Sequence, residues 1–336
     1  MSKIIDPKRI LISRTDSIGD VILTLPLCSA LKKEFPQAKI LFLAAAYTVP
    51  IVEQCEDVDH IYDWSSVKDC GLQTKLAFFE DMDADVIVHV FPRPELAKLA
   101  KLAGIPHRIG TSHRTYHLLS CNHRVNFSRK NSDLHEAQLN FCLLKPLGVK
   151  TDPTWEETQE LLSFKAPKTE YLSKFKAKKT KRVLLHSKSQ GSAIEWPISK
   201  YRELAHKCEE NGWEVCFTGT HGEGEEIRKE IQFNSQVLDT TGLFSLEELI
   251  GFIEEADVLV ACSTGPLHIA AGLNTPAIGL YTPRRPMHPG RWRPMGKNSE
   301  VITSKPGCSC KDKESCTCLV EIEVDDVFAK IQALLS

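Results

Sequence analysis

Short apolar runs alternate along the chain with amphipathic stretches. In the first half, Arg9–Arg14 predicts a strand, and Lys39–Ala45 and Asp85–Phe91 are apolar at nearly every position. Such runs are typical of strands that are covered on both faces of a sheet. After the first strand, Val21–Phe35 carries apolar residues at helical spacing, and Pro36 ends the predicted helix.

The second half repeats this scheme. Four apolar runs predict buried strands: Arg182–Ser187, Glu214–Gly219, Asp257–Ser263 and Pro276–Thr282. Between them, Ser199–Asn211 predicts a helix with Gly212 just past its end, and Ser245–Glu248 is a capping box that opens another helix. Strands that alternate with helices favour parallel sheets built from βαβ units. We therefore expect an α/β protein with two doubly wound domains.

Length and composition agree with two domains. The 336 residues correspond to roughly two domains of ordinary size. The stretch 150–180 is rich in lysine and has no clear strand pattern, so it is the expected linker. We place the domains at residues 1–165 and 166–336. The 42 basic and 44 acidic residues give a net charge of -2, which disfavours a nucleic-acid-binding protein. No apolar run is long enough to span a bilayer, and no signal peptide is evident, so we expect a cytoplasmic protein with, at most, peripheral membrane contact.

The charge is unevenly distributed. Leu96–Ser132 and Val258–Ser299 contain no Asp or Glu, although each carries several Arg, Lys and His residues. Each predicted domain thus has one basic segment, which suits two anionic ligands or one large anionic ligand. The alternative is that solvated basic faces happen to cluster there.

The turn after the first strand is the first candidate for chemistry. It reads Asp16-Ser17-Ile18-Gly19-Asp20. A glycine in this turn lets the backbone approach a ligand, and Asp20 would lie in the first turn of the next helix. Its carboxylate could accept a proton from an attacking hydroxyl. The alternative is that Asp20 only complements the helix dipole while Asp16 or Ser17 caps the helix.

Three further turns are suited to phosphate. Ser263–Ala271 follows a buried strand, and its small residues, with Pro266 in the first helical turn, leave backbone N–H groups open. Thr282–Arg293 contains four arginines and one Trp, and His186–Gly191 is a polar turn whose single cation is Lys188. The chain has neither G-x-G-x-x-G nor a P-loop motif, which weakens dehydrogenase and P-loop interpretations.

Four of the twelve cysteines form a C-x-C-x5-C-x-C cluster at Cys308, Cys310, Cys316 and Cys318. Four thiolates can bind zinc, but this spacing is tighter than that of the usual zinc knuckle. The spacing therefore favours free thiols or a redox-sensitive pair over a metal site.

Taken together, these motifs resemble glycosyltransferase family 9, the ADP-heptose:lipopolysaccharide heptosyltransferases. The resemblance rests on the S-x-G-D turn after the first strand, HEAQLNFCLLKPLGV near residue 135, the T-G-x-x-S-L segment and the S-T-G-P-x-H loop. It implies the GT-B fold, in which two Rossmann-like domains face a central cleft, and inverting transfer without a metal or other cofactor. It also implies a nucleotide-diphospho-sugar donor, most readily ADP-heptose, and an anionic, lipid-linked saccharide acceptor of the lipopolysaccharide inner core, at the cytoplasmic face of the inner membrane.

The resemblance places the catalytic base on Asp20, acceptor binding in the first domain and donor binding in the second. The donor residues that we expect are Ser187, Lys188, Ser189, Ser263, Thr264, Gly265, Pro266, His268, Arg284 and Arg285. The acceptor residues that we expect are Gly19, Arg93, Arg108 and Arg114. Two departures stand out, because many members have Asp at the position of Ser263 and Lys at that of Ile194. A nucleotide-sugar epimerase and a catalytically silent binding module remain alternatives.

Overall fold

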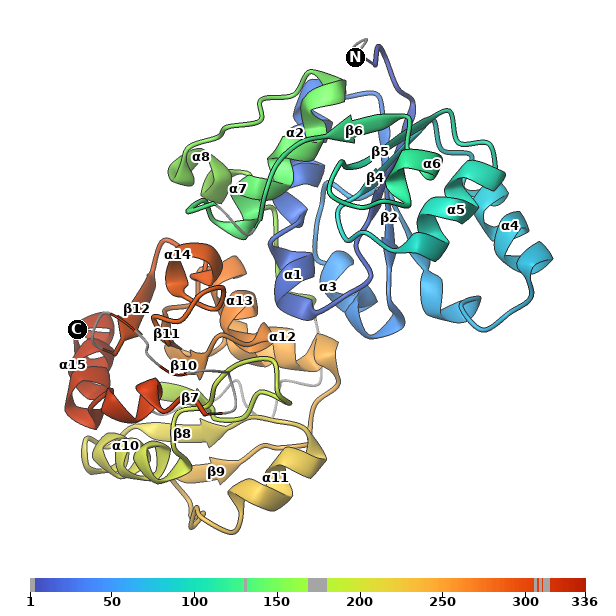
Figure 1. The fold of residues 1–336 in the computed structure, drawn as a ribbon. Coiled ribbons are helices and arrows are strands. Elements are labelled where there is room, and N and C mark those ends of the chain that lie inside the picture. Colours follow the sequence, from blue (N-terminus) through green and yellow to red (C-terminus); the bar gives the residue numbers. More distant parts are fainter. Residues whose placement is uncertain (1–3, 130–131, 169–179, 305–306, 308–309, 311–314) are drawn as a thin grey trace. The chain divides into compact units, whose positions relative to one another are not determined.

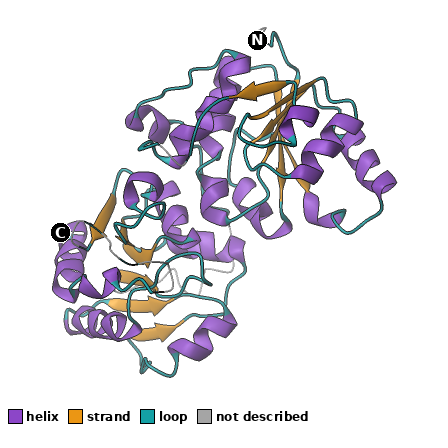
Figure 2. Cartoon of the chain, viewed as in Figure 1, coloured by secondary structure: helices purple, strands orange, loops and turns teal. Residues whose placement is uncertain are grey.

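The computed structural model describes residues 4–129, 132–168, 180–304, 307, 310 and 315–336. The chain divides into two compact units, Met1–Lys165 and Ala166–Ser336 (Figure 1). Each unit is a parallel sheet with helices packed around it (Figure 2). Within the described residues, every helix lacks either the length or the apolar character needed to span a membrane.

The first unit contains a six-stranded parallel sheet of order β3-β2-β1-β4-β5-β6. Its strands are β1 (Arg9–Ser13), β2 (Lys39–Ala44), β3 (His60–Asp63), β4 (Val86–His89), β5 (His107–Thr111) and β6 (His123–Val125). Its helices are α1 (Ile18–Ile22), α2 (Leu25–Glu34), α3 (Val49–Val52), α4 (Leu72–Asp81), α5 (Pro94–Leu102), α6 (His117–Ser120), α7 (Glu136–Phe141) and α8 (Trp155–Glu160), with 3-10 turns η1 (Ala46–Thr48), η2 (Trp64–Ser66) and η3 (Cys142–Leu147).

The second unit contains a six-stranded parallel sheet of order β12-β11-β10-β7-β8-β9. Its strands are β7 (Arg182–His186), β8 (Glu214–Phe217), β9 (Val237–Asp239), β10 (Val258–Cys262), β11 (Ala277–Tyr281) and β12 (Ser299–Thr303). Its helices are α10 (Ile198–Glu210), α11 (His221–Ile227), α12 (Leu246–Glu254), α13 (Gly265–Gly272), α14 (Pro289–Trp292) and α15 (Val324–Leu335), with the 3-10 turn η4 (Cys318–Glu321).

The predicted buried strands are confirmed, each within one or two residues at its ends. The single helix predicted over Val21–Phe35 is wrong. The structure has α1 and α2, which are separated at Leu23 and Thr24. Pro26 lies in the first turn of α2, where its missing N–H costs nothing, so the chain restarts a helix there instead of continuing α1.

The two sheets have the same strand order when each is numbered from its own first strand. In both, the order reverses beside the first strand, between β1 and β4 in one unit and between β7 and β10 in the other. Doubly wound sheets bind ligands at the carboxyl ends of the strands at this switch point. The turns that follow β1, β4, β7 and β10 are therefore the places to look for a site.

Candidate active site

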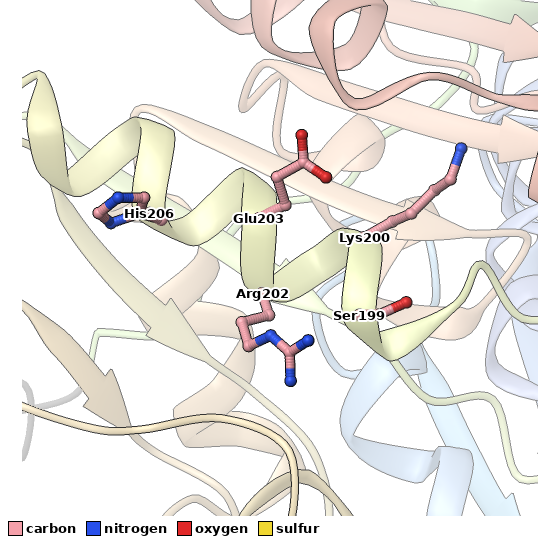
Figure 3. A pocket seen from close by; sticks show the side chains of 5 residues that line it. All are labelled: Ser199, Lys200, Arg202, Glu203 and His206. Atoms are coloured by element: carbon pink, nitrogen blue, oxygen red, sulfur yellow. The ribbon is translucent and has the colours of Figure 1, made fainter.

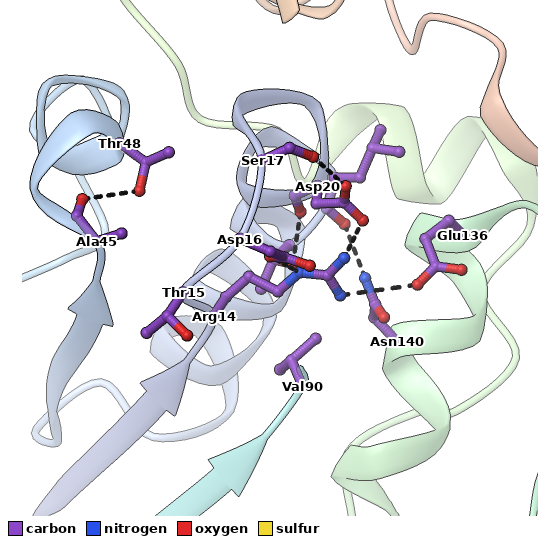
Figure 4. Close-up of polar contacts among 12 residues, drawn as sticks. Arg14, Thr15, Asp16, Ser17, Asp20, Ala45, Thr48, Val90, Glu136 and Asn140 are labelled. Atoms are coloured by element: carbon purple, nitrogen blue, oxygen red, sulfur yellow. Dashed lines mark hydrogen bonds and ion pairs between the residues drawn. The ribbon is translucent and has the colours of Figure 1, made fainter. Parts of the chain in front are cut away.

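The turn after β1 holds the Asp20 carboxylate from two sides. Ser17 is the N-cap of α1, and Asp20 lies in the first helical turn, as the sequence predicts. One carboxylate oxygen accepts a hydrogen bond from Nη2 of Arg14, and the other accepts one from Oγ of Ser17 (Figure 4). The Asp20 side chain keeps 20% of its surface exposed. Its position is therefore fixed, yet a substrate can reach it.

Arg14 is the centre of a buried ion network. Its side chain is only 3% exposed, and its Nε lies 2.7 Å from Oδ1 of Asp16. Its Nη1 lies 3.7 Å from Oε1 of Glu136, which is also buried. A guanidinium tolerates burial only when carboxylates compensate its lost hydration. Arg14 thus links the turn after β1 to α7, more than a hundred residues later in the chain.

α7 supplies the far side of this network. Glu136 and Asn140 lie four residues apart, so their side chains share one face of the helix. Arg129 donates to both, at 2.9 Å to Oε1 of Glu136 and 2.9 Å to Oδ1 of Asn140. Asn140 in turn donates to the carbonyl of Leu23 at 3.2 Å. This explains the H-E-x-x-x-N pattern, whose physical role the sequence alone did not reveal.

Asp16 is the second carboxylate of the turn. Burial raises its pKa to about 6, and the attraction of Arg14 only partly opposes this shift. The hydroxyl of Tyr47 donates to the backbone carbonyl of Asp16 at 2.7 Å, which ties the turn to η1. Asp16 therefore changes charge close to neutral pH while it contacts the arginine that orients Asp20.

The four expected acceptor residues differ in their placement. Gly19 lies beside Asp20 in α1. Arg93 follows β4, and its Nη2 is 3.4 Å from the carbonyl of Thr15, so it reaches the same switch point. Arg114 is exposed in the segment that follows the carboxyl end of β5.

Arg108 does not fit the expected acceptor role. It is the second residue of β5 and lies at the amino end of the strand, opposite the edge that carries Asp20. Its guanidinium donates to the carbonyls of Ile105 and Ser120, the latter at 2.7 Å. These bonds brace local backbone, so the contacts support a structural role.

Sequence analysis missed a buried polar group at the carboxyl ends of β1 and β4. Ser13 and His89 are register partners in these strands, and Thr15 and His117 are buried near them. His89 and His117 have ring centroids 5.8 Å apart. Within the described residues, both ring nitrogens of His89 and the hydroxyls of Ser13 and Thr15 lack hydrogen-bond partners. Burial lowers the pKa of His89 to about 3. Its imidazole is therefore neutral and offers one donor and one acceptor without charge. The signal available in the sequence was a histidine inside the otherwise apolar DVIVHVF run.

In the second unit, the loop after β10 begins α13 without a side-chain cap. Thr264 is the N-cap, and its Oγ1 is buried and has no hydrogen-bond partner among the residues described. Gly265 and Pro266 begin the first helical turn, and His268 is buried two residues after Pro266. Ser263 is half-buried beside them. The arrangement leaves the positive end of a helix and a hydroxyl for an anion.

In the turn after β7, most polar side chains contact nearby glutamates, and one hydroxyl does not. Ser189 donates its N–H and hydroxyl to Glu195, at 2.8 and 2.9 Å. Nζ of Lys188 lies 3.2 Å from Glu195 and 2.7 Å from Glu226. The hydroxyl of Ser187 is buried and, in the part of the chain described, unpaired. Ser187 is therefore the residue of this turn that is best placed to receive a ligand.

Ile194 stands where the resemblance to the family leads us to expect a lysine. Ile194 packs against the apolar core of the second unit. Trp196 is fully buried and donates from Nε1 to the carbonyl of Ile322 at 3.1 Å. This tryptophan therefore belongs to the core of the second unit and not to a base-stacking surface.

Arg284 and Arg285 lie in the loop after β11, at the carboxyl edge of the second sheet. Arg284 donates from Nη1 to the carbonyl of Cys310, which connects this loop to the cysteine segment. Cys310, Cys316 and Cys318 have their sulfur atoms within 4.8 Å of one another, whereas Cys308 lies outside the described residues. These three thiols are the group best suited to a metal among the residues that the structure describes.

A surface hollow of about 580 Å³ lies along α10 and is lined by Ser199, Lys200, Arg202, Glu203 and His206 (Figure 3). All five belong to one helix, and Lys200 and Arg202 are already engaged with Glu323 and Glu230. α10 packs against α15 and β8, and none of the residues predicted for the site lines the hollow. We do not treat it as part of the site.

Comparison with known proteins agrees with this geometry. The profile of glycosyltransferase family 9 (heptosyltransferase) matches residues 85–320. A putative glycosyltransferase of Haemophilus influenzae is 28% identical, over 98% of this chain and 97% of its own. Lipopolysaccharide heptosyltransferase 3 of Escherichia coli K12 is 25% identical, over 83% of each chain. The structure of E. coli ADP-heptose lps heptosyltransferase II superposes with a TM-score of 0.75 at 20% identity, over 98% of each chain.

These likenesses confirm two predictions made from the sequence, the GT-B architecture of two parallel six-stranded sheets and the family itself. The family match covers more than half of the residues. The chain is therefore a glycosyltransferase and belongs to glycosyltransferase family 9, the heptosyltransferase family.

Proposed function

We propose that this enzyme transfers a heptose from ADP-heptose to the inner core of lipopolysaccharide, with Asp20 as the general base. The observation that carries the proposal is the Asp20 carboxylate, which Arg14 and Ser17 hold at the switch point of the first sheet. The names of the relatives, lipopolysaccharide heptosyltransferase 3 and ADP-heptose lps heptosyltransferase II, support the choice of donor and acceptor.

The reaction follows from these groups. Asp20 accepts the proton of an acceptor hydroxyl while its oxygen attacks the anomeric carbon of the donor sugar. The bond from that carbon to the diphosphate oxygen breaks on the opposite face, so the configuration inverts. The departing ADP carries the negative charge away. Arg93 and Arg114 are the basic residues that we assign to the phosphorylated acceptor.

The second unit is suited to the diphosphate. Thr264 and Ser187 offer buried hydroxyls, and the N-terminal turn of α13 adds backbone N–H groups. Ser263, Gly265, Pro266 and His268 shape that turn, and Arg284 and Arg285 add positive charge from the neighbouring loop. Preorganised donors of this kind stabilise the charge that develops on a leaving group.

A short patch on α6 supports peripheral contact with the membrane. Leu118 and Leu119 are 57% and 78% exposed, which is unusual for adjacent leucines. Lys101 reaches the carbonyl of Leu119 at 2.8 Å, and Arg114 and Arg124 lie on either side in the sequence. Apolar side chains ringed by cations suit an anionic lipid surface. Co-sedimentation with anionic vesicles, compared with a Leu118→Ser, Leu119→Ser double variant, tests this contact.

The function is tested by incubating the protein with ADP-heptose, with and without an inner-core saccharide, and weighing the products by mass spectrometry. Transfer adds one heptose to the saccharide and releases ADP only when both substrates are present. A new sugar nucleotide from the donor alone would instead identify an epimerase. Binding of ADP without any product, over a panel of nucleotide sugars and acceptors, would identify a silent binding module.

A further inference from the structure

The cysteine segment between β12 and α15 forms a compact group of thiols. Cys310 and Cys316 precede η4 and Cys318 begins it, and the sulfur atoms of the three residues all lie within 4.8 Å of one another. Cys316 is buried, and the other two are half-buried. Three soft ligand atoms thus lie close together.

The spacing of these sulfur atoms suits one metal ion. Zinc binds thiolates at about 2.3 Å in a tetrahedral arrangement, which separates neighbouring sulfur atoms by about 3.8 Å. Thiols already within 4.8 Å need only small side-chain adjustments to reach that geometry. A disulfide would use two of the three and leave the third unexplained. Three thiolates also leave one coordination position for a further ligand.

The surroundings give such an ion a structural role. On one side, Leu319 and Ile322 are buried in the core of the second unit. On the other, the carbonyl of Cys310 accepts a hydrogen bond from Arg284, and Oγ1 of Thr282 lies 3.6 Å from the sulfur of Cys316. The thiols therefore stand between the hydrophobic core and the loop that follows β11.

We propose that Cys310, Cys316 and Cys318 bind one zinc ion, which fixes the loop of Thr282 and Arg284 against the C-terminal segment. The site does not depend on the proposed transfer reaction. The sequence favoured free thiols because the C-x-C pairs are tightly spaced, but the fold joins Cys310 to the second pair and removes that objection. The effect on the Arg284 loop bears on ADP binding only if the donor site proposed above is correct.

The test is elemental analysis of the full-length protein, purified under reducing conditions without a metal-affinity tag. We expect about one zinc per chain in the wild type. Cys316→Ser and Cys318→Ser should each lose most of the zinc. Cys70→Ser, which alters an exposed cysteine of the first unit, is the matched control and should retain it.

A second measurement keeps the test decisive if a variant unfolds. Cobalt added to the metal-free wild type should give a near-ultraviolet band of thiolate-to-cobalt charge transfer, and this band should weaken in Cys318→Ser, whose fold is checked by circular dichroism. The proposal is overturned if the wild type contains no zinc and gives no such band. It is also overturned if the intact mass shows that two of these cysteines are oxidised to a disulfide in the protein with full activity.

Discussion

The two switch points share a strand order but differ in the electrostatics of the turns that follow their strands. The turn after β1 is built from full charges, with Arg14 buried among Asp16, Asp20 and Glu136. The turn after β10 contains no acidic side chain and offers a helix N-terminus with the unpaired hydroxyl of Thr264. A base must keep its negative charge in place, whereas a diphosphate site must supply donors without adding negative charge. Under the proposed function, one topology thus serves two chemistries through the residues of its turns.

The largest effect is expected at Asp20. Asp20→Ala should lower kcat by about 10²–10⁴, the usual range for the loss of a general base. Transfer of heptose from ADP-heptose, measured at saturating substrates, checks this. Asp69→Asn, which changes an exposed carboxylate of the same unit, is the control and should leave kcat unchanged. Near-full turnover in Asp20→Ala would remove Asp20 from the role of base.

The buried network of the first unit should dominate its stability. Arg14→Met leaves carboxylates buried without their partner, so it should cost about 3–5 kcal/mol of the free energy of unfolding. Arg202→Met removes a surface ion pair to Glu230, 3.4 Å long and about half exposed, and should cost about 0–1 kcal/mol. Urea unfolding of the two variants provides the comparison. Equal losses would show that Arg14 does not hold the turn.

In the second unit, changes in the uncharged turn after β10 should alter the affinity for ADP. Thr264→Val removes the buried hydroxyl at nearly constant volume and should weaken ADP binding by roughly 10- to 100-fold, the value of a hydrogen bond to a charged group. Thr264→Ser keeps the hydroxyl and is the matched control. Calorimetric titration with ADP measures both. Equal affinity in Thr264→Val and the wild type would exclude this hydroxyl from the diphosphate site.

A further effect, which depends on pH, is expected at Asp16. Because burial raises its pKa to about 6, the folded state binds more protons than the unfolded state between roughly pH 4 and 6. The free energy of unfolding of the wild type should therefore fall relative to that of Asp16→Asn as the pH rises through this window. Urea unfolding of both proteins at several pH values isolates the contribution, since all other groups are shared. A constant difference between them would contradict the raised pKa.

The fold and the Asp20 turn were predictable because the signals are local. The run DVIVHVF is apolar enough to predict β4, and the glycine and aspartate of the turn lie directly after β1. Five strands were not predicted, because their sequences are short or mixed in polarity: the edge strands β3, β6, β9 and β12 and the interior strand β5. Local pattern is thus sufficient for the strands with long apolar runs and insufficient for the edge strands and for β5.

The contacts that hold Asp20 in place could not be predicted, because they join residues far apart in the chain. Arg14 was treated only as the last residue of a strand, and nothing in the sequence pairs it with Glu136 of α7. Arg108 was assigned to the acceptor because its segment lacks acids, but charge counted along the chain does not tell which end of β5 a residue occupies. Position along a strand, and not local charge, decides which residues reach the site.

The separate roles proposed for the two turns are tested most directly by the affinity of Asp20→Ala for ADP. If the first unit supplies the base and the second binds the diphosphate, this variant should bind ADP as tightly as the wild type, while its kcat falls sharply. A loss of ADP affinity as large as that of Thr264→Val would show that Asp20 belongs to the donor site and would contradict the account.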